Sequence, residues 1–125
     1  MPLTAEQFPE ALRMHMPCQP SPEVASHMSR VALTLVTGPA GVGKSSVMAA
    51  TELPRIVSDT IRSPRVNDGV METHGKEYWF MPDLDAVIAD VARGSYVQIA
   101  TGPSGKSFYG SRASSYPERG SALMD

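Results

Sequence analysis

The chain has 125 residues, of which 42% are hydrophobic and 19% charged, with a formal net charge of −2. This balance fits one folded domain with an apolar core, and the slight acidic excess argues against nucleic acid or a membrane as a partner. A single cysteine excludes an internal disulfide, and no apolar run is long enough to span a bilayer. With no secretory pattern among the first residues, we expect a cytoplasmic protein.

The N-terminal 29 residues are rich in proline, which blocks helix interiors because it lacks a backbone donor. The prolines are Pro2, Pro9, Pro17, Pro20 and Pro22. A short helix is expected over residues 4–14, where Thr4 and Gln7 could form a capping box. Residues 17–29 have the composition of a linker. We therefore expect residues 1–29 to be an extension ahead of a domain at residues 30–125.

The first strong element is the apolar, β-branched segment VALTLV at residues 31–36. Its length and composition predict a buried strand of the kind found in parallel sheets. A glycine-rich turn follows at residues 38–43. A helix is expected to start near Lys44 and to stop before Pro54, because the residue preceding proline disfavours helix.

The second half alternates short strands with one clear helix. Residues 82–93 place Leu84, Val87, Ile88 and Val91 on one apolar stripe, with Pro82-Asp83 at the start and Gly94 at the end. Strands are expected at residues 55–58, 76–81, 95–101, 107–111 and 121–124. Residues 63–75 read as a loop, residues 102–106 as a turn, and residues 113–119 as a short helix broken at Pro117.

Residues 38–45, GPAGVGKS, match the phosphate-binding loop G-x-x-x-x-G-K-[ST]. Glycine lets the backbone wrap a triphosphate with N–H groups, and the following helix points its positive end at the phosphates. Lys44 supplies a mobile positive charge, and the hydroxyl of Ser45 suits Mg²⁺. The alternative is a glycine-rich turn that binds nothing. A similar segment at residues 102–107, GPSGKS, has too short a spacing for such a loop and reads as a hairpin turn.

Three further segments carry polar or aromatic side chains suited to a phosphorylated ligand. They are Arg62-Ser63-Pro64-Arg65, Tyr78-Trp79-Phe80 and Tyr109-Gly110-Ser111. Arginine binds phosphate through two parallel hydrogen bonds and stays charged at any working pH. Alone, the first segment reads as a surface turn with two solvated arginines, the second reads as a core strand, and the third could be the end of a hairpin.

In this order, the segments resemble guanylate kinase over about residues 31–125. The family pattern is a phosphate loop, then S-x-T-x-R-x-P-R, here residues 58–65, a Y-x-F strand, an amphipathic helix and a Y-G-[ST] turn. The resemblance implies an α/β fold: a P-loop NTPase core with a parallel sheet, incomplete here, and a small mixed-sheet lobe at about residues 58–112. That lobe would bind the nucleoside monophosphate.

The resemblance also implies roles for individual residues. ATP would be bound by Gly38, Gly41, Val42, Gly43, Lys44, Ser45 and Ser46, with Mg²⁺ on Ser45. The phosphate of GMP would be bound by Arg62, Arg65, Tyr78 and Tyr109. Ser58, Gln98 and Ser111 would lie near the guanine, and Asp125 would be a further nucleotide or Mg²⁺ contact. Lys44, Arg62 and Arg65 would serve catalysis.

Three departures from the family pattern bear on function. Gln98 stands where the family has a glutamate that accepts two guanine N–H groups; an amide has only one acceptor, and it pairs better with the edge of adenine. The segment between Lys44 and Ser58 is short. The chain also stops at Asp125, before the family's lid arginines and C-terminal core, as expected of a truncated relative.

These features predict phosphoryl transfer from ATP to a nucleoside monophosphate, with GMP favoured over AMP. One alternative is a catalytically weak or inactive nucleotide-binding module derived from a guanylate kinase. Another is an unrelated P-loop NTPase in which the arginines are coincidental. Because an incomplete parallel sheet exposes an apolar edge, we also expect self-association.

Overall fold

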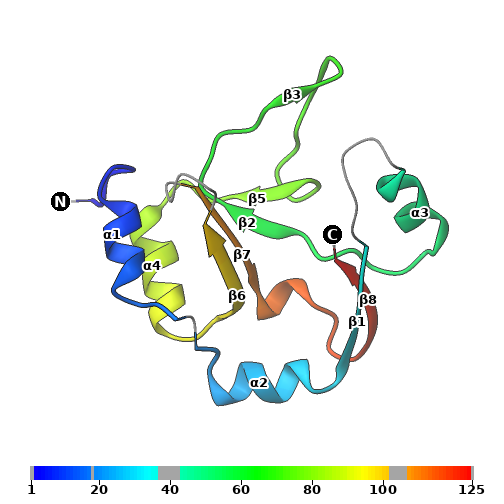
Figure 1. Ribbon diagram of the computed structural model, residues 1–125, viewed down its shortest axis with the longest axis horizontal. Coiled ribbons are helices and arrows are strands. Elements are labelled where there is room, and N and C mark those ends of the chain that lie inside the picture. The colour runs from blue at the N-terminus through cyan, green and yellow to red at the C-terminus, as the bar shows by residue number, and fades with distance from the viewer. Residues whose placement is uncertain (1, 18, 37–42, 102–106, 125) are drawn as a thin grey trace.

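A computed structural model describes residues 2–17, 19–36, 43–101 and 107–124. The chain is mixed α/β, and its elements follow one another as shown in Figure 1. They are α1 (Phe8–Arg13), α2 (Pro22–Met28), β1 (Val31–Leu35), α3 (Lys44–Ala50), β2 (Ser58–Thr60), β3 (Val66–Asn67), β4 (Val70–Met71), β5 (Tyr78–Phe80), α4 (Leu84–Ala92), β6 (Tyr96–Thr101), β7 (Phe108–Arg112), the 3₁₀ helix η1 (Ala113–Ser115) and β8 (Gly120–Met124).

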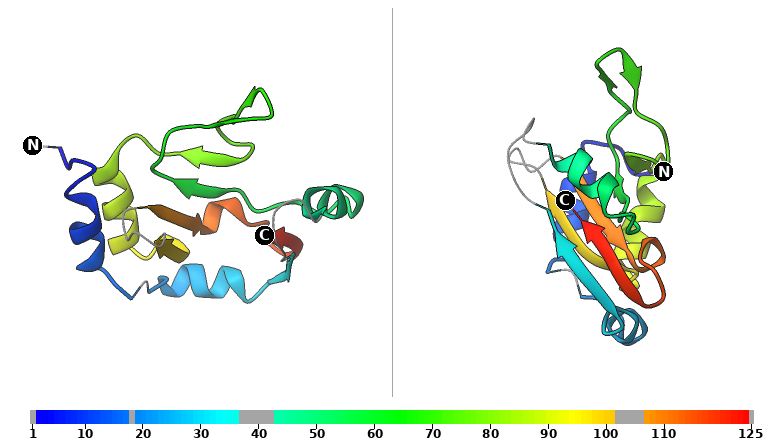
Figure 2. Two further views of the ribbon diagram at one scale, coloured as in Figure 1. Left: turned by 45° about the horizontal axis from the view of Figure 1, so that its top comes forward. Right: turned by 90° about the vertical axis from the view of Figure 1, so that its right-hand side faces the viewer.

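The largest sheet has four strands in the order β5-β2-β7-β6. β2 and β5 are parallel, whereas β7 runs antiparallel to both β2 and β6. Helices α1 and α4 lie side by side along this sheet, as Figure 1 and Figure 2 show. Their buried side chains meet those of β6 and β7 in one apolar core, which comprises Phe8, Leu12, Val87, Val91, Tyr96 and Phe108.

The prediction of a linker at residues 17–29 is wrong in part, because residues 22–28 form helix α2. Ser21 caps this helix by accepting a hydrogen bond from the backbone N–H of Val24. The capping box is confirmed: the backbone N–H of Thr4 donates to Gln7, and that of Gln7 donates to Thr4. Helix α1 is shorter than expected, beginning at Phe8. The proline-rich region therefore contributes two helices, and one of them completes the core of the four-stranded sheet.

Strand β1 is confirmed, but its expected burial is wrong. It pairs in parallel with β8, yet the side chain of Leu35 is 64% exposed and that of Leu33 40%. Within the described residues, β8 is the only strand hydrogen-bonded to β1, so this sheet has two strands. A parallel pair of strands is thus present, whereas a complete P-loop core remains an expectation.

The helix expected after the glycine-rich turn begins at Lys44, as expected, and ends before Pro54. Helix α4 is also confirmed, with Asp83 as its N-cap and Gly94, at φ +77°, directly after its last turn. The strand expected at residues 55–58 is wrong in its bounds, because β2 spans Ser58–Thr60 and Arg55 makes an isolated bridge to Leu123. The predicted loop at residues 63–75 contains the β3–β4 hairpin. The turn at residues 102–106 lies outside the described residues.

No helix in the described ranges combines the length and apolar character needed to cross a membrane.

Candidate functional site

A pocket of about 260 Å³ opens on one face of the four-stranded sheet. Its lining includes five of the residues expected near the monophosphate, although they are far apart in the sequence. They are Ser58, Tyr78, Gln98, Tyr109 and Ser111. The fold thus gathers most of the expected acceptor site into one cavity.

The alternation of side chains along each strand explains why these residues share a face. Successive residues of a strand point to opposite sides of the sheet. In β2, Ser58 lines this pocket while its neighbour Asp59 lines a different one, and Tyr78 and Trp79 divide in the same way in β5. The spacing of the motifs therefore decides which side chains can meet a common ligand.

Gln98 reaches the pocket because β6 is irregular at this point. Tyr96 pairs with Arg112, but Gln98, two residues later, pairs with Ser111, one residue earlier, so β6 carries an extra residue. Such a bulge turns the following side chain to the other face of the sheet. Without it, Gln98 would share the side of Tyr96, which is buried in the core.

Hydrogen bonds hold the end of the pocket at which Gln98 and Ser111 lie. The hydroxyl of Tyr116 donates to the buried Ser111 at 2.8 Å, and the amide of Gln98 donates to the sulfur of Met124 at 3.5 Å. Gly110 lies between the two pocket residues of β7. A Cβ there would come within 2.9 Å of the ring of Tyr96, so only glycine lets this core residue pack so closely beneath the pocket.

Arg62 lies against the aromatic wall of this site. Its guanidinium is 4.9 Å from the ring centroid of Tyr78, and the rings of Tyr78 and Tyr109 are 5.6 Å apart. Three of the four side chains expected to bind the acceptor phosphate therefore lie together. Arg65 does not join them: its side chain is exposed and does not line the pocket.

Sequence reasoning missed Glu72, which binds Arg62. Both carboxylate oxygens accept hydrogen bonds from the guanidinium, at 2.6 and 3.0 Å, and one also accepts from the backbone N–H of Arg65. The hydrogen bonds from Arg62 and from the Arg65 backbone lower the pKa of Glu72 to about 2. The same contact with Glu72, helped by Tyr109, raises the pKa of Arg62 above its ordinary value. No spacing pattern marked Glu72, which directly follows the β3–β4 hairpin.

The expected ATP-binding residues are only partly within the described ranges. Gly43 has a left-handed φ of +99°, which favours glycine, and Lys44 is the first residue of α3. Ser45 and Ser46 lie in the first turn of that helix. Gly38, Gly41, Val42 and Asp125 lie outside the described residues. In Figure 1, α3 lies beside the β1–β8 pair, at the opposite end of the molecule from α1 and α4.

In the described residues, no group of three or more His, Cys, Asp or Glu side chains is arranged to hold a metal ion. The expected Mg²⁺ contact does not require one, because it uses the hydroxyl of Ser45 and the phosphates of the nucleotide. The turn from a left-handed Gly43 into the helix at Lys44 fits the end of a phosphate loop, where the loop passes into its helix. The Mg²⁺ site stays a prediction.

The chain is similar to curated guanylate kinases, which confirms the resemblance seen in its motifs. It is 42% identical to a guanylate kinase of Streptomyces coelicolor over 69 residues, and 41% identical to one of Streptomyces kasugaensis over 69 residues. Each match covers 50% of this chain. The chain spans about a third of the length of these relatives, since 33% and 32% of their residues are covered. No model of a protein family matches the chain.

Proposed function

We propose that this chain acts in the ATP-dependent phosphorylation of a nucleoside monophosphate, with GMP as the favoured acceptor. The observation that carries the proposal is the pocket lined by Ser58, Tyr78, Gln98, Tyr109 and Ser111, with Arg62 beside its aromatic wall. The similarity to proteins named guanylate kinase supports the same reaction.

The acceptor would bind with its base between Gln98 and Ser111 and its phosphate toward Arg62. The hydroxyls of Tyr78 and Tyr109 would donate to the phosphate oxygens, and the guanidinium would contribute two parallel hydrogen bonds. Because Glu72 already binds the guanidinium of Arg62, the incoming phosphate must share this guanidinium with the carboxylate or displace the carboxylate. The acceptor phosphate is itself anionic, so the transfer needs no general base, and alignment with neutralisation of charge supplies most of the catalysis.

The donor would be ATP with Mg²⁺, bound by the loop at residues 38–45. When bound, Mg²⁺ would neutralise negative charge on the phosphate oxygens. On this chain, Ser45 would contact the metal, Lys44 would follow the charge of the transferred group, and Arg65 would assist from the turn after Arg62. The left-handed φ of Gly43, directly ahead of α3, supports this part of the proposal.

A second function is favoured by two specific features of the site. Gln98 presents a donor where guanine also presents one, and Glu72 competes with phosphate for Arg62. Both features would weaken a productive complex. The chain would then be a nucleotide-binding module that binds ATP or a monophosphate without turnover.

A coupled assay of ADP release, with GMP, dGMP, AMP and UMP as acceptors, separates the two functions. The kinase proposal predicts ADP only when a monophosphate is present. Calorimetry with the same ligands then tests binding. Heat without ADP release would favour the non-catalytic module, and neither heat nor release would refute both.

The variant Arg62→Ala should reduce the affinity for the accepted monophosphate by about tenfold or more, since a hydrogen-bonded charge is lost. Arg119→Ala removes an equal charge at an exposed position and should leave that affinity unchanged. Equal affinities for the two variants would mean that the arginine is coincidental, as in an unrelated P-loop protein.

A further inference from the structure

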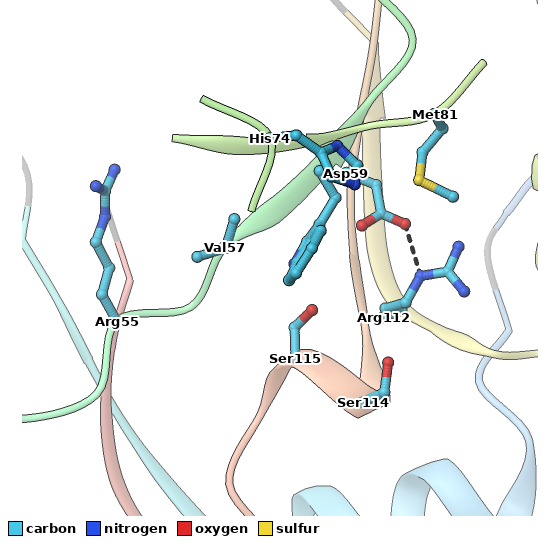
Figure 3. A pocket seen from close by; sticks show the side chains of 9 residues that line it. Arg55, Val57, Asp59, His74, Met81, Arg112, Ser114 and Ser115 are labelled. Atoms are coloured by element: carbon cyan, nitrogen blue, oxygen red, sulfur yellow. Dashed lines mark hydrogen bonds and ion pairs between the residues drawn. The ribbon is translucent and has the colours of Figure 1, made fainter. Parts of the chain in front are cut away.

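A second pocket, of about 500 Å³, opens on the other face of the four-stranded sheet (Figure 3). Its lining includes Val57, Asp59, Trp79, Met81, Arg112 and Ser115. Because β2 and β5 alternate, Asp59 and Trp79 point away from the pocket that holds Ser58 and Tyr78. The proposed nucleotide site uses none of the side chains in this list.

The most unusual group in this pocket is the carboxylate of Asp59, which is fully buried. One of its oxygens, Oδ2, accepts from the hydroxyl of Tyr96 at 2.6 Å and from Nε of Arg112 at 2.7 Å. The other oxygen, Oδ1, is buried and has no hydrogen-bond partner among the described residues. Leaving a buried acceptor unpaired is costly, and native proteins rarely do so without a reason.

The surrounding contacts fix the carboxylate in this orientation. Arg112 also forms an ion pair with Asp90 at 3.2 Å and donates to the Tyr96 hydroxyl at 2.8 Å. Burial, together with the hydrogen bond to Asp59, raises the pKa of Tyr96 well above its ordinary value, so its hydroxyl remains a donor. The Tyr96 hydroxyl and the Nε of Arg112 therefore both donate to Oδ2 and not to Oδ1. Figure 3 shows Oδ1 directed away from Arg112, toward the side on which Val57 and Ser115 lie.

The walls of the pocket suit a flat, apolar ring. Trp79 is 38% exposed, and its indole packs edge-on against His74, with ring centroids 5.1 Å apart. Gly75 lies beneath the same indole: a Cβ there would come within 2.8 Å of it. The indole is thus held in place with part of its surface available for stacking. Met81, which Figure 3 shows beside Asp59 and Arg112, is unbranched and can adapt its rotamer to the shape of a ligand.

The charges around the pocket select the kind of donor that can bind. Within the described residues, Arg112 is paired with both Asp59 and Asp90, and Asp90 is also paired with Arg93, so two arginines balance two carboxylates. A neutral N–H donor would complete Oδ1 of Asp59 and leave this balance unchanged, whereas an organic cation would add an unpaired charge.

We propose that this pocket binds a neutral, planar heteroaromatic molecule that carries an amino group, with its ring stacked on Trp79 and its N–H donated to Oδ1 of Asp59. The interaction completes the hydrogen bonding of the carboxylate without adding charge. The inference stands apart from the proposed nucleotide site and does not depend on it.

The test uses the chain's single tryptophan, whose indole N–H gives one signal in a proton–nitrogen NMR spectrum. The probes are 2-aminoquinoxaline and quinoxaline, which share a neutral bicyclic ring and differ in the amino donor. Titration of the intact chain should shift the indole signal with both, and the amino compound should bind about tenfold more tightly. Equal affinities, or no shift with the amino compound, would overturn the proposal.

Variants locate the binding. Ser115→Leu should fill part of the pocket and weaken 2-aminoquinoxaline by at least tenfold, whereas Ser26→Leu, the same change at an exposed position of α2, should not. Asp59→Asn should abolish the preference for the amino compound. If this variant does not fold, the affinities of the two probes for the unmodified chain still test the proposal. Unchanged affinity in Ser115→Leu would refute this pocket as the site.

Discussion

Among the single residues of the candidate site, Arg62 and Gln98 have the clearest consequences for function. Arg62 is held by both oxygens of Glu72, and Gln98 is turned into the pocket by the bulge in β6. In the proposed function, Arg62 would bind the acceptor phosphate and Gln98 would select the base. Each therefore makes a prediction that a conservative substitution can test.

Replacing Gln98 with glutamate should increase the preference for GMP over AMP by about tenfold, because a carboxylate can accept from two adjacent guanine N–H groups. The ratio of the two affinities, measured by calorimetry, gives the result. Gln19→Glu adds the same charge at an exposed position and should not alter this ratio. An unchanged ratio in Gln98→Glu would mean that the base does not lie against β6.

Glu72 should make stability depend on pH in the acid range. Its pKa is lowered from 4.5 to about 2 in the folded chain, so its stabilisation is complete above pH 4.5 and is lost as the pH falls toward 2. Urea unfolding of Glu72→Gln should therefore show its largest loss of stability above pH 4.5. The difference from the unmodified chain should shrink as the pH approaches 2.

The matched control is Glu118→Gln, which removes the same charge at an exposed position. Its stability relative to the unmodified chain should not change over the same pH range in this way. A difference for Glu72→Gln that is constant with pH would mean that the carboxylate packs without its ion pair.

At the scale of elements, helix α4 depends on its two ends. Asp83 accepts a hydrogen bond from the backbone N–H of Ala86 at 3.1 Å, and Gly94 accepts one from the N–H of Ser21 at 3.0 Å. A Cβ on Gly94 would come within 2.5 Å of that same nitrogen. The end of α4 is thus tied to the start of α2, which holds the N-terminal region against the lobe.

Removing the cap in Asp83→Ala should lower the free energy of unfolding by about 1 kcal/mol, since one backbone donor of the first turn loses its partner. Asp83→Asn should cost much less, because asparagine is an equally good cap. Urea unfolding followed by circular dichroism measures both. Equal losses in the two variants would assign the effect to charge instead of capping.

At the scale of the whole molecule, the proline-rich N-terminal region is built into the core. Phe8 is 1% exposed and Leu12 2%, and the ring of Phe8 meets that of Phe108 edge-on at 5.6 Å. The lobe expected to bind the acceptor therefore takes part of its core from residues outside the expected domain boundary. Exposed apolar side chains on β1 remain the basis for expecting self-association.

Phe8→Ala should destabilise the chain by about 3–5 kcal/mol, because it leaves a cavity between α1, α4 and β7. Met14→Ala, at a side chain that is 81% exposed, should have almost no effect. Urea unfolding monitored through Trp79 reports on the sheet directly. A loss below about 0.5 kcal/mol in Phe8→Ala would make α1 a dispensable extension.

The local elements could be predicted because their signals lie within a few residues. The apolar stripe and caps of α4, the capping box of Thr4 and Gln7, and the helix starting at Lys44 follow from spacing and backbone preference alone. The residues expected at the acceptor site could likewise be predicted, because they belong to short motifs whose order resembles that of guanylate kinase.

Only the tertiary structure decided which of these residues meet. The bulge that turns Gln98 to the pocket, the capture of Arg62 by Glu72 and the place of Phe8 in the core all depend on contacts between segments distant in sequence. The exposure of β1 and the unpaired oxygen of Asp59 have the same origin. Strand register and the packing of one layer on another set these features, and neither is encoded in a local pattern.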